Sequence, residues 1–503
     1  MSATSIFCGV VFGTLLFITS FVCILFVSAF TTPLWLIRPD LYRHLSDKLV
    51  AGWEFYIVLT SLHRNLSARV HKLGICLGEV RRSDRAAVSH AEPFITVTQV
   101  PFVFIGLSRA DHRCQKPVRQ LHCLQTAARN CGNMSTSSTV RGVVFAALLF
   151  ITSFVGILFF SVFTTPVWLI RPGLYRYLSD RLVATWEFYI VALLEVFLNI
   201  RVIISGDRIR PHECNVIMMN HRTRLDWMYF WCVLARQSGS STEKIILKSP
   251  LKHIPGAGWA MQQVAFMFLD RKWDHDRKVM TQLMNHYSDL NVNMQASILI
   301  YPEGTDLTKD TKERSHAYAK KYDLDCYEYV LHPRTTGVTY LIDYMRNNGM
   351  LDAVYDVTIA YPYQFPQTES ELVFGCFPTE IHFHIERHGI SKIPATAAEI
   401  RTWCEKCWAL KEKRLQRFYE LKRFNNVKVS EAPTRWQRLL LWVVAIGWTL
   451  VAAGVIALFF WSWVVRWMMG VQMVFYIVMD FCGGFELMQV KYYNYFHTPS
   501  KSS

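Results

Sequence analysis

The sequence predicts an α/β fold, in which a central sheet has flanking helices and is joined to N- and C-terminal membrane helices. Between residues 200 and 390, short apolar runs alternate with helical stretches, as strands and helices do in α/β domains. Long apolar runs without charge lie on either side of this region. The composition agrees, because 51% of the 503 residues are hydrophobic and only 18% are charged.

Seven strand-like runs define the predicted sheet. Each is short and apolar, and several are bounded by polar residues or by glycine and proline. Helices are expected between several of them, for example over 276–290 and 339–346. The expected strands cover residues 202–204, 216–219, 245–247, 264–269, 298–301, 354–360 and 381–385.

The apolar runs outside the sheet predict membrane helices. Residues 142–170 carry no charge, and this run exceeds the roughly 20 residues that a membrane helix needs. A second uncharged run, 439–465, has tryptophans near both ends, as an interfacial belt requires. The shorter run 467–479 could re-enter the bilayer or span it. The apolar segment 182–200 contains two glutamates, so we expect it to lie in the interface or to form the second arm of a hairpin.

The N-terminal part of the chain contains a near repeat, because residues 1–58 recur with few changes as 134–191. The spacer 62–133 lacks sustained periodicity and is expected to be disordered. Our hypothesis is that the first copy and the spacer come from a tandem-exon or gene-model fusion, and that the functional protein starts at Met134. An additional membrane helix with a poorly ordered loop is the alternative. Abundant peptides from 62–133 in the native protein would contradict the fusion.

These boundaries divide the chain into seven expected parts. Chemistry is expected in the α/β part, because strand-to-loop junctions carry the functional side chains of α/β enzymes. The parts are 1–61, a duplicated membrane segment; 62–133, a disordered spacer; 134–200, an N-terminal membrane hairpin; 201–395, the α/β domain; 396–430, a basic amphipathic helix; 431–490, the C-terminal membrane helices; and 491–503, a tail.

The formal charge of +15 indicates an anionic partner. No nucleic-acid motif is present, so nucleic acid is not the expected partner. Lys and Arg beside apolar segments fit anionic lipid or orientation in a bilayer better. Residues 397–424 combine an apolar helical stripe with many basic residues. That helix either lies on a membrane surface or docks on its own domain.

The 13 cysteines are scattered and odd in number, which favours reduced thiols over a disulfide framework. Cys404 and Cys407 form a lone pair within a helical pattern. A zinc site would need two further ligands, so we expect no metal.

His221 and Asp226 form the most informative motif, at the end of the apolar run 215–219. In a chain with 17 histidines this spacing alone arises by chance about once, so its position is what matters. Asn220 and Thr223 supply N-cap chemistry for a helix beginning near Leu225. A tight loop would return the carboxylate to the imidazole, which could then act as a base toward a hydroxyl.

Three further loops follow apolar runs. Arg271 comes after 264–269 and could bind a phosphate, or pair with Asp270 or Asp274. Glu303 and Gly304 follow 298–301, where the glycine would permit a close backbone approach. The last loop contains Pro333 and Arg334. Each loop alone is compatible with an ordinary turn or surface pair, but four such loops in one α/β unit favour a common site.

These four loops resemble the four motifs of the 1-acylglycerol-3-phosphate acyltransferases, the glycerolipid acyltransferase family. The order is the same, and the resemblance extends over residues 140–480. The residues around the motifs most resemble the lysocardiolipin-acylating members. One position departs from the wider family, since Asp306 stands where many members have Arg or Ser. That departure disfavours a phosphate contact at position 306 and simple lysophosphatidic acid as the main substrate.

The resemblance implies an acyltransferase domain with a central mixed sheet, which transfers an acyl chain from acyl-CoA to a lysophospholipid hydroxyl. His221 would be the general base and Asp226 would orient it. The phosphate end of the acceptor would be bound by the other motifs. No cofactor or metal is expected, because acyl-CoA is an activated co-substrate. The acceptor-binding residues would be Arg271, Glu303, Gly304, Thr305, Pro333 and Arg334.

Other functions stay open from the sequence. A CoA-independent transacylase can use the same pair, and a membrane scaffold needs no chemistry at all. The basic residues Arg435 and Arg438, beside the apolar run 439–465, indicate a cytosolic catalytic face. The resemblance implies the endoplasmic reticulum membrane. The expected partners are therefore acyl-CoA, a lysophospholipid and the bilayer.

Overall fold

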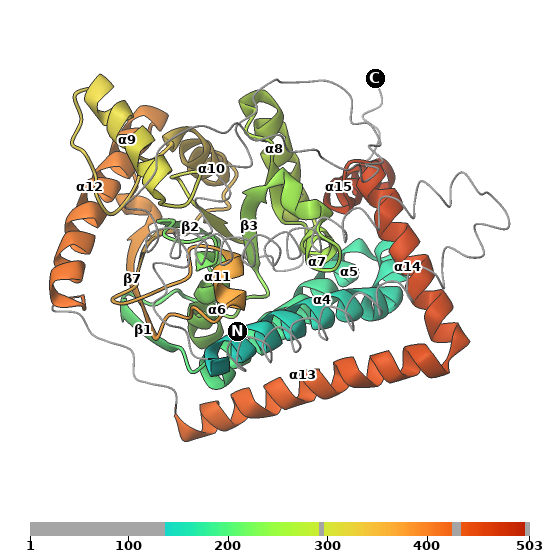
Figure 1. Cartoon of the computed structure of the whole chain (residues 1–503). Helices are drawn as coiled ribbons and strands as arrows, with labels where there is room; N and C mark the ends of the chain where they lie inside the picture. The colour runs from blue at the N-terminus through green and yellow to red at the C-terminus, as the bar shows by residue number, and fades with distance from the viewer. Residues whose placement is uncertain (1–135, 291–295, 425–433, 498–503) are drawn as a thin grey trace, which may run out of the picture. The chain divides into compact units, whose positions relative to one another are not determined.

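The computed structural model describes residues 136–290, 296–424 and 434–497 (Figure 1). The predicted repeat 1–58 and spacer 62–133 lie outside these residues, so the fusion hypothesis stays a prediction. Within the described residues, two helices precede the sheet, namely α4 (Thr136–Ile170) and α5 (Pro172–Ala192). A π-helical turn, η1 (Leu193–Phe197), then leads into the first strand.

The described residues contain a seven-stranded sheet in the order β1-β7-β6-β2-β5-β3-β4. It is mixed, as expected, because β6 and β7 pair antiparallel while the other neighbours pair parallel. All seven expected strands form, but the fourth is shorter than the expected 264–269, because residues 264–266 form the turn that follows α7. The strands are β1 (Arg201–Gly206), β2 (Asn215–Met219), β3 (Glu243–Lys248), β4 (Met267–Leu269), β5 (Ser297–Ile300), β6 (Ala353–Ala360) and β7 (Glu380–Gly389).

Helices cover both faces of the sheet (Figure 1). The expected helices 276–290 and 339–346 correspond to α8 and α10, with longer bounds. The helices between the strands are α6 (Asp226–Gln237), α7 (Ala257–Gln263), α8 (Trp273–Asp289), α9 (Lys309–Lys321), α10 (Thr335–Asn347) and α11 (Glu369–Val373), with 3₁₀ turns η2 (Ser249–His253) and η3 (Ile390–Lys392). After the sheet come α12 (Ala397–Leu421), α13 (Arg435–Trp461), α14 (Trp463–Phe481) and α15 (Phe485–His497).

The central strands are buried on both sides, which explains their continuous apolar sequence. In β2, Ile217 and Met219 join a core with α5 and α6, whereas Val216 and Met218 join a core with α8, α10 and α12. This alternation follows from the two-residue period of a strand. The sheet therefore forms a rigid layer from which the loops at its ends project.

The helix α12 docks on its own domain, which was one of the two expectations for the basic segment. Its apolar stripe is buried and includes Cys404, Trp408, Leu415 and Phe418. The side chain of Lys411 is fully buried and binds Asp356 and the carbonyl of Val357, both at 2.6 Å. The exposed basic residues of α12 lie on the opposite side.

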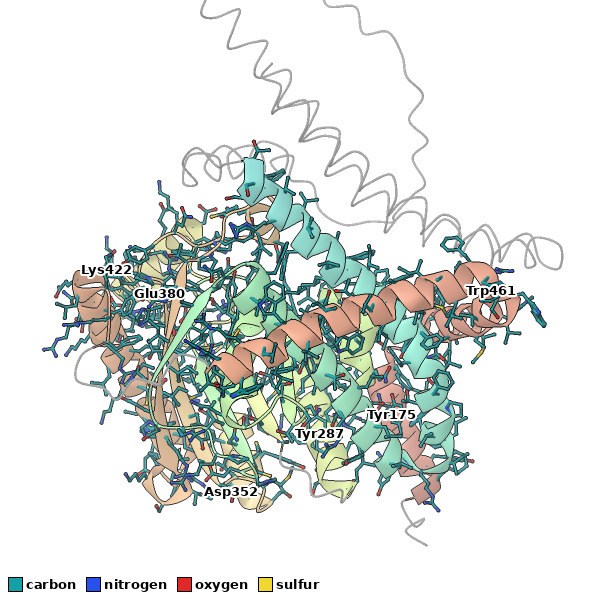
Figure 2. The ribbon with its side chains drawn as sticks, turned by 90° about the horizontal axis from the view of Figure 1, so that it is seen from below. Tyr175, Tyr287, Asp352, Glu380, Lys422 and Trp461 are labelled. Atoms are coloured by element: carbon teal, nitrogen blue, oxygen red, sulfur yellow. The ribbon has the colours of Figure 1, made fainter. Side chains whose placement is uncertain are left out.

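Three of the described helices are long and apolar enough to cross a membrane, namely α4, α13 and α14. The helix α5, expected as part of a membrane hairpin, does not meet that test. It packs against α4, as the second arm of the expected hairpin would, and also against α13 and α6, and it buries Arg176, Asp180 and Glu187. Trp461, at the end of α13 farthest from the sheet, is 89% exposed (Figure 2).

Candidate active site

The loop that carries His221 begins at a fixed point on the sheet. The carboxamide of Asn220 donates to the carbonyl of Ile359 at 3.1 Å and accepts the N–H of the same residue at 2.8 Å. Asn220 thus joins the end of β2 to β6, and the expectation that it caps a helix is wrong. Thr223 does contribute to the helix start, since its Oγ1 accepts the N–H of Leu225 at 3.0 Å.

His221 and Asp226 are brought together as expected, with Nδ1 and Oδ2 separated by 3.0 Å. The same Oδ2 accepts the N–H of Arg222 at 2.6 Å and the N–H of Thr223 at 2.9 Å. The other oxygen, Oδ1, accepts the hydroxyl of Tyr361 at 2.6 Å. Asp226 is fully buried, so these donors hold the carboxylate in one orientation.

This arrangement assigns the protonation of the imidazole. An ionised carboxylate only accepts hydrogen bonds, so Nδ1 of His221 must carry the proton and Nε2 is left as an acceptor. Nε2 makes no hydrogen bond with a described residue, and the side chain is 17% exposed. The ring of Tyr301 stacks on the imidazole with centroids 4.2 Å apart, which limits rotation of the ring. The arrangement can therefore accept a proton from a ligand.

Glu303 is buried beneath the same loop and connects three elements. Its Oε1 accepts the N–H of His221 at 3.3 Å and the indole N–H of Trp408 at 3.4 Å. Its Oε2 accepts the N–H of Leu331 at 3.2 Å. Burial raises the pKa of Glu303 to about 7, although the N–H donors of Leu331 and His221 oppose that shift. Because only 3% of the residue is exposed, this geometry favours a positioning role over the expected acceptor contact.

Arg271 reaches the loop of the third motif. Its guanidinium donates to the carbonyl of Gly304 at 2.7 Å, and it forms no ion pair with Asp270, Asp274 or another described residue. Arg271 has φ 65°, a conformation that non-glycine residues adopt at a cost of about 1–3 kcal/mol. Gly304 has φ 70°, so glycine is favoured there too.

The fourth motif completes this group of loops. The N–H of Arg334 donates to the carbonyl of Pro302 at 2.7 Å, and a Cβ on Gly304 would lie 3.5 Å from Cδ of Arg334. Pro333 precedes Arg334, which is exposed and directly precedes α10. The N-terminus of α10 adds a partial positive charge to the two arginines. Arg271, Gly304 and Arg334 are thus brought together in an arrangement suited to an anion.

Thr305 and Asp306 face a different set of partners. The hydroxyl of Thr305 lies 3.4 Å from Oδ1 of Asp306. Oδ2 of Asp306 accepts the amide of Gln367 at 3.0 Å and lies 3.8 Å from Nε of Arg224. This acid is therefore engaged within the protein, which agrees with the expectation that position 306 is not a phosphate contact.

The sequence did not indicate roles for Tyr301, Tyr361 and Trp408. These side chains contact His221, Asp226 and Glu303, respectively, from outside the motif loops. Tyr301 directly precedes the third motif, and its position at a strand end was the available signal. Tyr361 lies directly after β6, at the end of the sheet that also carries His221. Trp408 comes from α12, far away in the sequence, so no local pattern could have indicated it.

No group of three or more His, Cys, Asp or Glu residues that could hold a metal ion is found within 136–290, 296–424 and 434–497. Cys404 and Cys407 are buried against the sheet in α12, and burial raises the pKa of the Cys404 thiol to about 12. These thiols are core side chains.

Known proteins match this chain over the same regions. The acyltransferase family model matches residues 201–361, and the model of the acyltransferase C-terminus matches 371–447. Lysocardiolipin acyltransferase 1 of Gallus gallus is 42% identical over 367 residues, which cover 72% of this chain and 97% of that protein. The protein of the same name from Danio rerio is 49% identical over 280 residues, or 56% of this chain and 72% of that protein.

A more distant relative is lysophosphatidylinositol acyltransferase 10 of Caenorhabditis elegans. It is 39% identical over 252 residues, which cover 50% of this chain and 64% of that protein. The Gallus gallus relative is matched over almost its whole length, so the likeness extends well beyond the motifs. The chain therefore belongs to the 1-acylglycerol-3-phosphate acyltransferase family, the glycerolipid acyltransferases.

Proposed function

We propose that this acyltransferase transfers an acyl chain from acyl-CoA to a free hydroxyl of an anionic lysophospholipid, with His221 as general base. The observation that carries the proposal is the pairing of His221 Nδ1 with Asp226, which leaves Nε2 unpaired and accessible. The Gallus gallus and Danio rerio relatives act, by their names, on lysocardiolipin. A lysocardiolipin-type acceptor is therefore our first candidate, with lysophosphatidylinositol and lysophosphatidic acid as alternatives.

In the proposed step, Nε2 takes the hydroxyl proton while the hydroxyl oxygen attacks the thioester carbonyl. The C–S bond then breaks, and the imidazolium returns the proton to the CoA thiolate. Asp226 stays ionised throughout and stabilises the imidazolium, as the acid of a Ser-His-Asp triad does. The protein supplies no nucleophile, since the thioester is already activated. A general base of this kind contributes on the order of 10²–10⁴ in rate.

We propose that Arg271, Gly304 and Arg334 bind the acceptor phosphate. Two guanidinium groups and a helix N-terminus suit that anion. Pro333 and Thr305 shape the loops on either side, and Glu303 positions the His221 loop from beneath. Support for direct contact is strongest for the two arginines, which are exposed, and weakest for Glu303, which is buried.

A cavity of about 300 Å³ beside the His221 loop supports an acceptor larger than a single phosphate ester. Nη1 of Arg222 donates to the carbonyl of Leu307 at 2.9 Å, which fixes the guanidinium at the cavity wall. Lys312 and Glu328 also line the cavity and pair with each other, so Arg222 is the cation there that no acid neutralises among the described residues. A headgroup with a second anionic group could bind there. This feature favours the lysocardiolipin-type acceptor over simple lysophosphatidic acid.

The proposed location is the endoplasmic reticulum membrane, with the catalytic domain facing the cytosol and its acyl-CoA. Three long apolar helices support membrane insertion. The basic residues Arg435 and Arg438, in the first turn of α13, favour a cytosolic position for that end.

The test of the mechanism is acyl transfer by purified, membrane-reconstituted protein. His221→Ala should lower kcat by about 10²–10⁴-fold without changing thermal unfolding. His212→Asn, at the other end of the sheet and in a left-handed conformation that asparagine tolerates, is the matched control. Near-normal transfer by His221→Ala would refute the assignment of the base.

A second experiment identifies the donor and the acceptor. Wild-type protein is given lysocardiolipin, lysophosphatidylinositol or lysophosphatidic acid, each with and without acyl-CoA, in vesicles that contain intact phospholipid. Transfer that requires acyl-CoA supports the proposal. Equal transfer without acyl-CoA would identify a transacylase, and no transfer to any acceptor would favour a scaffold.

A further inference from the structure

A second cationic site lies at the end of the sheet opposite His221. β2 and β6 run parallel, and β6 and β7 run antiparallel, so the end of β7 and the start of β2 lie at the same end of the sheet, on either side of the start of β6. β1 runs parallel to β7 and ends on the same side. Figure 2 labels one residue at each end, with Glu380 on the side of His221 and Asp352 on the opposite side. The proposed catalytic loops do not reach this second side.

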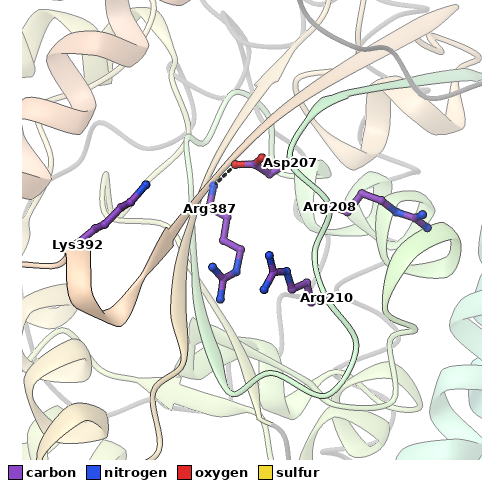
Figure 3. A pocket seen from close by; sticks show the side chains of 5 residues that line it. All are labelled: Asp207, Arg208, Arg210, Arg387 and Lys392. Carbon is purple, nitrogen blue, oxygen red and sulfur yellow. Dashed lines mark hydrogen bonds between the residues drawn. The ribbon is translucent and has the colours of Figure 1, made fainter.

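The site is a cavity of about 370 Å³ between the β1–β2 loop and the turn that follows β7 (Figure 3). Four cationic side chains and one carboxylate line it. The carboxylate, Asp207, accepts the backbone N–H of Arg387 at 2.8 Å and so joins the two segments. The five lining residues are Asp207, Arg208, Arg210, Arg387 and Lys392.

Arg387 is held rigidly by a neighbouring acid. Its Nε lies 3.1 Å from Oε2 of Glu213 and its Nη2 lies 2.7 Å from Oε1, which is a bidentate pair. The hydroxyl of Tyr355 donates to the same Oε2 at 2.6 Å and fixes the carboxylate. Nη1 of Arg387 takes no part in this pair. The guanidinium is therefore held in place before any ligand binds, and Nη1 stays available to donate a hydrogen bond to a ligand.

The other cations are poorly neutralised. Neither Arg208 nor Lys392 forms an ion pair with a residue in the described ranges, and Nη1 of Arg210 lies 3.5 Å from Glu213 with 62% of its side chain exposed. Four positive side chains around one small space repel one another, and two carboxylates do not balance them. A bound anion would relieve that repulsion.

We propose that this cavity binds a soluble phosphorylated anion with at least two negative charges, of about the size of a diphosphate. Arginine forks match phosphate oxygens in geometry and charge. The volume lies in the range of small-molecule sites. The anion would bridge Arg208 and Arg210 in the β1–β2 loop to Arg387 and Lys392 after β7. It would thereby stabilise the folded chain by preferential binding.

A soluble ligand fits better than a lipid headgroup because of where the apolar helices pack. α13 contacts η1, and η1 leads into the start of β1, which lies at the same end of the sheet as His221. The start of α4 lies against Gly375, in the segment between α11 and β7 that also precedes the start of β7. Both helices thus approach the end of the sheet that is remote from the cavity.

The test is a titration of the full chain, in neutral phosphatidylcholine nanodiscs, with inorganic pyrophosphate. The probe variant is Arg208→Gln/Lys392→Gln, because neither side chain has an ion-pair partner among the described residues. The control is Lys406→Gln/Lys413→Gln, which removes the same charge from the exposed side of α12. Calorimetry gives the affinity, and thermal unfolding shows whether each variant is folded.

Pyrophosphate should bind the wild type and the control with similar affinity and raise their Tm, and should bind the probe variant at least about 10-fold more weakly. Equal affinity in all three proteins, or no binding to the wild type at equal ionic strength, would overturn the proposal. A second arm replaces pyrophosphate with phosphatidic acid in the nanodisc. If only that lipid raises the Tm in a way that depends on Arg208 and Lys392, the ligand is a headgroup and the soluble assignment is wrong. Neither readout depends on acyl transfer.

Discussion

In the loop after β2, the buried Asp226 is surrounded by N–H and O–H donors, whereas between α5 and β3 the buried Asp180 is held by two cations. Arg176 donates to Oδ2 of Asp180 at 3.0 Å, and Lys244 lies 2.9 Å from Oδ1. Two further buried glutamates nearby, Glu187 and Glu243, each have a carboxylate oxygen without a hydrogen-bond partner in the described part of the chain.

This difference separates two uses of buried charge. Neutral donors fix the direction of a carboxylate without adding charges that titrate, which suits a side chain that must orient an imidazole. Paired charges hold α5 to the sheet, but their desolvation cost is high and depends on protonation. Accordingly, burial raises the pKa of Glu187 to about 7 and lowers the pKa of Lys244 to about 8. In the first region the contacts orient the carboxylate of Asp226, and in the second the ion pairs attach α5 to the sheet.

The strongest test of the first region is Asp226→Asn. The amide of asparagine would bring N–H groups toward the N–H groups of Arg222 and Thr223, and it cannot stabilise an imidazolium. We expect kcat to fall by about 10²–10⁴-fold, measured as acyl transfer to a lysophospholipid. The control is Asp352→Asn, since Asp352 also accepts a backbone N–H, from Cys214, but lies at the other end of the sheet. Equal losses in both variants would point to folding instead of catalysis.

The corresponding test of the second region is Lys244→Met. Removing one partner of a buried pair typically lowers the free energy of unfolding by about 3–5 kcal/mol. We expect a large drop in the Tm of the reconstituted protein, while exposed Lys248→Met, in the same strand, should change little. A small effect of Lys244→Met would show that α5 is held mainly by apolar packing.

Glu303 combines features of both regions, since it accepts N–H donors and its burial raises its pKa. Glu303→Gln replaces one acceptor oxygen with a donor, so we expect the free energy of unfolding to fall by about 1–3 kcal/mol at low pH. Glu412→Gln is the matched control, because Glu412 also accepts three backbone N–H groups but is partly exposed. Thermal unfolding is the measurement.

The pH dependence of Glu303 has a definite sign. Its pKa is raised from 4.5 to about 7 in the folded state, so the folded chain binds more protons than the unfolded chain between these values. Stability from this group is therefore present below pH 4.5 and is lost as the pH rises to about 7. The Tm of Glu303→Gln should fall less steeply than that of the wild type across this window. Parallel curves would contradict the raised pKa.

The smallest effect is expected at the edge of the first region, at Arg271. Arg271→Ala removes one exposed cation from the proposed phosphate site but leaves the base intact. The KM for lysophospholipid should rise by about 10-fold, or ~1.4 kcal/mol, with a smaller change in kcat. Lys272→Ala, which removes the adjacent exposed cation, should change the KM much less. A loss confined to kcat would place Arg271 at the reacting atoms instead.

The described fold follows largely from local patterns in the sequence. Each of the seven strands coincides with a run of apolar residues, because a strand covered on both faces needs them. The proximity of His221 and Asp226 was also predictable, since a short loop between a strand and a helix can return a carboxylate to an imidazole five residues before it. The segment 182–200 was harder to interpret, because its two glutamates suggested a position at the membrane interface, whereas Glu187 is buried and Glu195 pairs with Arg236 of α6.

The sequence by itself determined which residues would be available: a base, its acid, two arginines and a glycine, each placed after an apolar run. Tertiary structure decided which of them face a ligand. Glu303 turned inward because backbone N–H groups of two loops and the indole of Trp408 converge on it. Tyr361 reached Asp226 because β6 lies beside β2. Such contacts depend on the order of strands in the sheet, and strand order is not encoded in any local pattern.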